Sequence, residues 1–192
     1  MKKTIILFLI VSIFYNHANS QITKNNWMVG GNASFVFSKA SVEDNNNSKT
    51  ANLILAPNIG YFFMDKFAGG VRLSFNRDHI KYGPSDNLAI FKNYSIGPFV
   101  RYYLLDVDRQ SNILIEGSYQ FGNDKVETTN STSNNSTNII SFSAGPVIYF
   151  NGSVGIEFLL NYSSTGTKGY KGRGDSFGVS IGLQIHLEKD KN

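Results

Sequence analysis

The chain has 192 residues, the length of a single domain, and its lack of cysteine excludes disulfides, thiolate metal sites and a lipidated N-terminal cysteine. Charged residues make up only 17% of the chain and aromatic residues 14%, a balance that suits a lipid-facing surface better than a water-facing one. The net charge is only slightly positive, and no basic patch with interleaved aromatic residues indicates a nucleic-acid partner.

The first 20 residues have the three parts of a secretory signal peptide. Lys2 and Lys3 form a positive start, Ile5 to Tyr15 form an apolar run, and Ala18-Asn19-Ser20 offers small residues to a signal peptidase. A membrane-spanning helix would need about 20 apolar residues, and the run stops well short of that length. We therefore predict cleavage after Ser20 and a mature domain of residues 21–192.

The mature chain contains eight segments that read as β-strands. Each is bounded by turn residues, and most alternate apolar with small or polar side chains, the period of a strand with two different faces. In chain order they are Trp27–Phe37, Ala51–Phe63, Phe67–Asn76, Asn93–Leu105, Asn112–Phe121, Ile139–Phe150, Val154–Tyr162 and Ser176–Leu187.

The last of these segments has the most regular alternation. From Ser176 to Leu187 six apolar residues occupy the odd positions, and small or polar residues occupy the even ones. Twelve residues exceed the usual soluble strand and are enough to cross a bilayer at a tilt, which takes roughly 9–11 residues. Such strands can lie in a membrane only as a closed barrel, because an open sheet leaves backbone groups unpaired.

The connections between the strands alternate between short and long. Asn151-Gly152, for example, is a strong signal for a tight hairpin. The long polar connections are 38–50, 77–92, 122–138 and 163–175, and the low-complexity part of the third, 128–137, is expected to be mobile. Tight periplasmic turns and long outer loops are typical of outer-membrane barrels, and an even strand number leaves both ends of the barrel on the periplasmic side.

The apolar faces of the predicted strands carry no charged residue over their membrane-length portions. A lysine or arginine on a lipid face would cost about 2–4 kcal/mol near the midplane, so this absence indicates contact with lipid. Three prolines, Pro57, Pro98 and Pro146, interrupt the outward faces, each after a small residue. Proline removes a ladder hydrogen bond, so we expect bends or bulges at these points.

Four charged residues fall on inward-facing positions: Arg72, Arg101, Glu116 and Glu157. Counted from the periplasmic strand ends, they lie at nearly the same level, which predicts a structural ion cluster inside the barrel. The alternative is a catalytic or conducting constellation. The bulky inward residues Phe62, Phe99, Tyr103 and Tyr149 predict a filled lumen without a diffusion channel, because eight strands enclose only enough room for side chains.

Signals for catalysis and for ligands are few. The mature chain has two histidines, His79 in a long loop and His186 on the lumen face, and neither has a serine at a nucleophile–base spacing. No metal-ligand spacing is present, and we predict no cofactor. Lys168, Lys171 and Arg173 lie in a glycine-rich outer loop without the GKS/T element of a phosphate loop, and they could contact lipopolysaccharide phosphates.

Three stretches resemble the family of small OmpA/OmpX-like outer-membrane β-barrels. Ile59–Gly70 resembles the first periplasmic hairpin, Gly97–Leu104 the fourth strand, and Gly182–Leu187 the terminal strand that the barrel-assembly machinery reads. The resemblance implies an eight-stranded barrel over Trp27–Leu187 and recognition of strand 176–187 by that machinery. It carries over no catalytic residue, and it implies a surface, adhesion or envelope role.

The sequence therefore predicts an all-β, eight-stranded antiparallel up-and-down transmembrane barrel of the outer membrane. Its predicted partners are membrane lipids and lipopolysaccharide, the assembly machinery and an extracellular ligand of the loops, and its predicted role is structural or interactional. Two alternatives stay open at this point. One is an outer-membrane enzyme acting on lipid A or phospholipid, although the chain lacks the His-x-Ser arrangement of small-barrel lipases and deacylases. The other is a soluble lipocalin-like periplasmic binder with its apolar faces inside.

Overall fold

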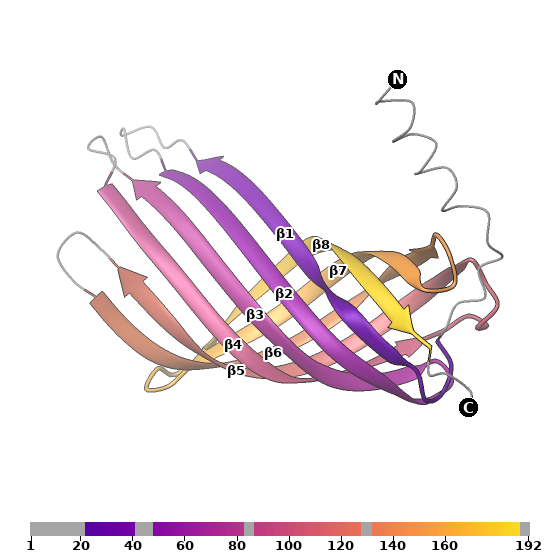
Figure 1. Cartoon of the computed structure of the whole chain (residues 1–192). Coiled ribbons are helices and arrows are strands. Elements are labelled where there is room, and N and C mark those ends of the chain that lie inside the picture. Colours follow the sequence, from indigo (N-terminus) through magenta and orange to yellow (C-terminus); the bar gives the residue numbers. More distant parts are fainter. Residues whose placement is uncertain (1–21, 41–47, 83–86, 128–131, 189–192) are drawn as a thin grey trace, which may run out of the picture.

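In the computed structural model, residues 22–40, 48–82, 87–127 and 132–188 are described, and they form a closed antiparallel barrel (Figure 1). Each strand pairs with the next one along the chain, and the last strand pairs with the first, so the predicted up-and-down topology is confirmed. The strands are β1 (Trp27–Ala40), β2 (Ser48–Met64), β3 (Phe67–Tyr82), β4 (Asn87–Tyr103), β5 (Ser111–Glu127), β6 (Thr132–Tyr149), β7 (Val154–Thr167) and β8 (Arg173–Leu187).

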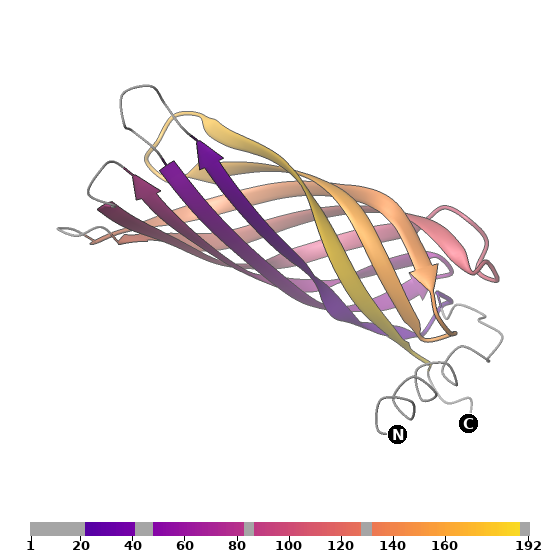
Figure 2. The ribbon, with the colours of Figure 1, turned by 90° about the horizontal axis from the view of Figure 1, so that it is seen from above.

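The barrel has two different ends. The strands run obliquely, and the short β2–β3, β4–β5 and β6–β7 connections gather at one end (Figures 1 and 2). Trp27 pairs with Leu187 at this same end, which we call the periplasmic end, while the other end is called the extracellular end. The predicted signal peptide lies outside the described residues. No helix among the described residues has the length and hydropathy needed to span a membrane.

Several strands continue further toward the extracellular end than the sequence predicted. His79 belongs to β3 and pairs with Ala51, so its predicted loop position is wrong. The predicted connection 122–138 is also wrong in part, because residues 122–127 belong to β5, residues 132–138 belong to β6 and the two strands pair here, while residues 128–131 lie outside the described chain. The physical reason is that a backbone ladder can continue in polar sequence, since its hydrogen bonds do not require a buried side-chain face.

An apolar band surrounds the barrel. The outward positions of all eight strands carry large hydrophobic residues that are exposed in the isolated chain, from Trp27 on β1 to Leu187 on β8. On β3 the outward positions of the band run from Phe67, which is half-buried, to the exposed Phe75, and the exposed Arg77 follows. That length matches the roughly 9–11 residues of a tilted membrane strand. The lipocalin-like alternative required these apolar faces to point inward, and the structure places them outside.

The three strand prolines interrupt the barrel wall without changing its register. Each proline and the residue before it pair with the preceding strand but not with the following one. On β6, for example, Gly145 and Pro146 pair with β5, whereas the β6–β7 pairing skips from Ala144 to Val147 in unchanged register. Of the expected bends or bulges, the bulges are wrong, because no extra residue is inserted at these points and two residues of one ladder are unpaired instead.

The core lies at the periplasmic end of the lumen. Phe62, Met28, Tyr103 and Tyr149 are fully buried there. The segment before β1 covers the periplasmic opening of the barrel. Its Ile22 is fully buried, and the Ile22 carbonyl accepts a hydrogen bond of 2.8 Å from the Lys66 backbone N–H. The periplasmic half of the barrel is therefore filled by side chains.

Candidate functional site

The four inward charges predicted from the sequence meet in the middle of the lumen. They come from four strands, with Arg72 on β3, Arg101 on β4, Glu116 on β5 and Glu157 on β7. All four are almost completely buried. The alternation of each strand sends these side chains inward, and the shared level along the barrel brings them into contact. Two positive and two negative groups leave the cluster without net charge.

Glu116 is the centre of this ion cluster. Arg72 binds it through two guanidinium nitrogens, of which Nη2 lies 2.8 Å from Oε2. Arg101 binds it from the neighbouring strand, with Nη2 at 2.7 Å and Nε at 3.1 Å from Oε2. Arg101 Nη1 also donates to Glu157 Oε1 at 2.6 Å. Paired charges of this kind offset the high free-energy cost of taking each ion out of water.

Uncharged residues complete the surroundings of the cluster. Phe99 lies beside both guanidinium groups, with its ring centroid 5.2 Å from Cζ of Arg72 and 5.6 Å from Cζ of Arg101. Such cation–π contacts add stabilisation in a desolvated site. Gly182 on β8 leaves room for Asn32 and Glu157, because an added Cβ would come closest to Asn32 Oδ1 and would lie 2.9 Å from Glu157 Oε2. The sequence showed that Phe99 points inward, but this partnership depends on side-chain positions across the lumen.

On the extracellular side of the ion cluster, the lumen is polar and contains open space. Two adjoining cavities of about 550 and 510 Å³ occupy the extracellular half. Short polar side chains line them and bond to each other, as when Ser95 donates to Gln120 at 2.7 Å and Asn161 donates to Ser180 at 2.9 Å. The prediction of a filled lumen is therefore confirmed for the periplasmic half. The extracellular half contains a polar cavity, and the ion cluster lies at the periplasmic side of this cavity.

The two histidines among the described residues lie in different parts of the barrel. His186 is buried at the periplasmic end among three aromatic rings, with centroid distances of 5.5 Å to Phe62, 6.2 Å to Tyr103 and 5.7 Å to Tyr149. Its two ring nitrogens have no hydrogen-bond partner among the described residues. His79 lies near the extracellular end of β3, so the structure does not bring the histidines into one site. No group of three His, Asp or Glu arranged like metal ligands occurs in the described part of the chain.

The three basic residues of the predicted outer loop differ in their surroundings. Lys168 and Lys171 are exposed in the β7–β8 connection. Arg173, the first residue of β8, donates to Asn138 Oδ1 and to Ser164 Oγ, both at 2.9 Å. The structure therefore ties Arg173 to the barrel wall and leaves the two lysines in the exposed connection.

A second group of charges lies beyond the apolar band. Glu127, at the extracellular end of β5, forms ion pairs with Lys125 at 2.7 Å and Lys92 at 2.8 Å. Hydrogen bonds from these lysines lower the pKa of the Glu127 carboxyl to about 2. Surface pairs of this kind contribute little to stability. The buried ion cluster differs from them because removing one of its members leaves a buried charge without its partner.

Comparison with known proteins supports the fold. No family model matches the chain, and no curated protein matches it. Among solved structures, Neisserial surface protein A is 18% identical with a TM-score of 0.53, and the match covers 83% of this chain and 96% of that one. The N-terminal β-barrel domain of Pseudomonas aeruginosa OprF is 12% identical (TM-score 0.49; 85% and 98% covered), and Yersinia pestis Ail is 15% identical (TM-score 0.46; 86% and 100% covered). The resemblance to small eight-stranded barrels is thus confirmed for the fold.

Proposed function

We propose that this chain, which has the fold of the small outer-membrane barrels, is an integral outer-membrane protein serving as a rigid scaffold for surface interactions. The membrane holds the apolar band, the ion cluster closes the lumen, and the extracellular strand ends and loops present the interacting surface. Loops carried by a rigid framework commonly supply binding function. The fold shared with Neisserial surface protein A supports the outer-membrane location.

The observation that carries this proposal is the polarity of the barrel, which is the reverse of that in a soluble protein. Large hydrophobic residues are exposed around the outside, while arginine and glutamate side chains are buried inside. Monomeric soluble proteins rarely expose contiguous apolar patches larger than a few hundred Å². A continuous apolar band around a closed barrel is stable only against lipid.

Membrane insertion can be measured directly. The full-length chain expressed in a Gram-negative host is expected in the outer-membrane fraction, extractable by detergent but not by salt or carbonate. The unheated sample should migrate faster in a denaturing gel than the boiled one, because a closed barrel resists unfolding by the detergent. Recovery of the processed chain in the soluble periplasmic fraction would contradict the proposal.

We also propose that the outer basic residues contact phosphate groups of lipopolysaccharide. Lys168 and Lys171 are the residues to change, because Arg173 also bonds to the wall. Lys168→Gln with Lys171→Gln is expected to weaken binding of purified lipid A to the folded barrel about threefold to tenfold. Lys66→Gln, on the periplasmic turn, is the matched control and should leave binding unchanged. Equal lipid A binding by both variants would dismiss the contact.

We propose that the chain is not an enzyme. His186 is enclosed by aromatic rings at the closed end, and His79 lies at the other end of the lumen. Neither histidine forms a hydrogen bond to a serine side chain among the described residues.

We also propose that β8 directs assembly of the barrel. Exposed and buried side chains alternate over residues 180–187 of this strand, with Leu183, Ile185 and Leu187 exposed and Gln184 and His186 buried. This is the pattern that the assembly machinery would read.

A further inference from the structure

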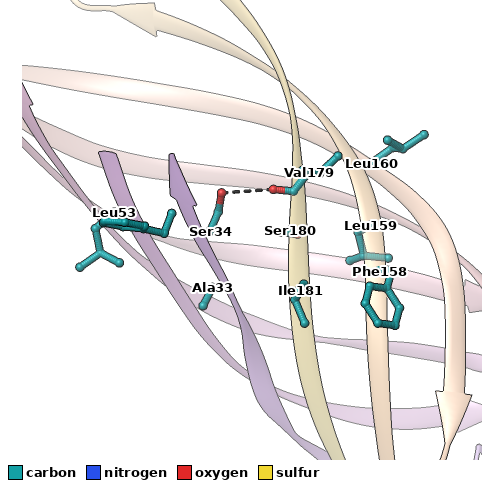
Figure 3. A pocket seen from close by; sticks show the side chains of 10 residues that line it. Ala33, Ser34, Leu53, Phe158, Leu159, Leu160, Val179, Ser180 and Ile181 are labelled. Carbon is teal, nitrogen blue, oxygen red and sulfur yellow. Dashed lines mark hydrogen bonds between the residues drawn. The ribbon is translucent and has the colours of Figure 1, made fainter. Parts of the chain in front are cut away.

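The barrel wall is incomplete between its first and last strands. Among the described residues, β1 pairs with β2 over 14 residue pairs, but it pairs with β8 over only seven, from Trp27↔Leu187 to Ala33↔Ile181. Toward the extracellular end the two strands separate. A side-chain hydrogen bond from Ser34 Oγ to the Val179 carbonyl, at 3.1 Å, lies where the pairing ends (Figure 3).

A groove lies along this open seam. Its volume is about 660 Å³, which falls within the usual range of ligand pockets. Side chains of four strands line it, and most are apolar (Figure 3). Phe35, Leu53, Phe158, Leu160, Val179 and Ile181 form its rim. Leu159, which points inward and is buried, belongs to its lining and lies between the outward residues of β7.

The groove joins two different environments. Its rim residues belong to the apolar band, so the groove is continuous with the lipid-facing surface of the barrel. Four residues of β1 and β8, Ala33, Ser34, Val179 and Ser180, line both this groove and the polar cavity of the extracellular lumen. Strand backbone without a neighbour is tolerated at membrane depth where it lines a polar cavity that water can enter, and the inner side of the seam borders such a polar cavity.

We propose that this groove is a lateral binding site for one acyl chain of an outer-leaflet membrane lipid. The chain enters between β1 and β8 and contacts Leu159 at the edge of the lumen, while its head group remains at the level of the extracellular mouth. The site rests on the proposed membrane location, because its rim continues the lipid-facing band. The apolar lining and ligand-sized volume fit a single hydrocarbon chain.

Fluorescence quenching by brominated lipid tests this site. The full mature chain would be folded into vesicles of phosphatidylcholine with brominated acyl chains, which quench tryptophan only at close approach. In a Trp27→Phe background, which removes the single natural tryptophan, three variants are compared. Phe158→Trp reports the outer surface, Val147→Trp the closed lumen and Leu159→Trp the proposed site.

We expect Leu159→Trp to be quenched strongly, at least half as much as Phe158→Trp. Quenching of Val147→Trp should be several-fold weaker than that of Leu159→Trp. Quenching of Leu159→Trp no greater than that of Val147→Trp, with Phe158→Trp quenched, would overturn the acyl site alone. Absence of quenching for all three would overturn the membrane location as well.

A second measurement covers the case in which a bulky tryptophan prevents folding. The chain has no cysteine, so Leu159→Cys can carry a single spin label. Collisions with oxygen, which concentrates in the hydrocarbon, should exceed those with a water-soluble nickel chelate if the acyl chain reaches this position. The reverse order of accessibility would overturn the proposal. Ser180→Cys, at the boundary of the groove and the lumen cavity, is the comparison for a position with more water access.

Discussion

Replacing Glu116 by alanine is expected to lower the free energy of unfolding of the barrel by about 3–5 kcal/mol. Glu116 accepts hydrogen bonds from both Arg72 and Arg101, and its side chain is almost fully buried. Its removal leaves a positive charge in the lumen without its carboxylate, and Arg72 loses the partner of its ion pair. Breaking a buried pair from one side is costly for this reason, even where the intact pair contributes little net stability.

The measurement is a urea titration of the barrel in lipid vesicles. Unfolding is monitored by Trp27 fluorescence and by the gel migration of unheated samples. Glu127→Ala is the matched control, since it removes a glutamate with two lysine partners from the same strand outside the apolar band. That change should stay below about 1 kcal/mol. Equal unfolding midpoints for Glu116→Ala and the unchanged protein would show that the ion cluster does not affect the stability of the barrel.

A second set of variants separates the buried charge from the interaction itself. Removing both members of the pair, by Arg72→Met with Glu116→Leu, eliminates the unpaired charge and fills similar space. Apolar replacements of whole buried ion pairs are often neutral or stabilising. The double variant is therefore expected to be more stable than Glu116→Ala, although it lacks two charged groups rather than one.

Replacing Gly145 by alanine is expected to destabilise the barrel by about 3 kcal/mol, the upper part of the range for overpacked sites. A Cβ at this position would lie 1.9 Å from the Phe158 carbonyl oxygen on β7. That oxygen belongs to the backbone, so relief requires the strands themselves to separate. Gly97 has the same arrangement, with an added Cβ 2.0 Å from the Tyr119 carbonyl oxygen.

The same urea titration measures this effect, and Gly117→Ala is the control. At Gly117 the nearest atoms to an added Cβ belong to the Phe142 ring at 3.7 Å, which is ordinary contact distance. We expect its change to be close to zero or slightly stabilising, because alanine restricts the unfolded chain. If Gly145→Ala and Gly117→Ala were equally tolerated, the close approach of β6 and β7 beside Pro146 would not be a constraint on folding.

The interrupted ladder explains how the barrel accommodates proline, and at two of the three prolines a glycine precedes it. A central strand normally excludes proline, and a closed barrel has no edge on which to place it. Here Gly97 and Gly145 precede Pro98 and Pro146, and the ladder to the following strand is interrupted over both residues of each pair. The preceding strand remains paired, so the wall loses rungs on one side and keeps its register.

The sequence by itself determined the eight strands, the direction of their faces and the level of the four inward charges. These features follow from a two-residue period and from turn residues, which are local properties of the chain. The outward Phe67–Phe75 face and the inward positions of Arg101 and Glu116 could both be read in this way. Periodicity could not give the extracellular ends of the strands, because polar residues carry no signal for where a backbone ladder stops.

Only the tertiary structure decided which groups meet across the lumen and where the wall is open. The two arginines converge on Glu116, Phe99 lies beside both of them, and each contact depends on the stagger between strands that are distant in sequence. The seam beyond Ala33↔Ile181 arises where β8 returns to β1. Closure of a barrel depends on the tilt and stagger of all eight strands together, so it cannot be predicted from the sequence of any single strand.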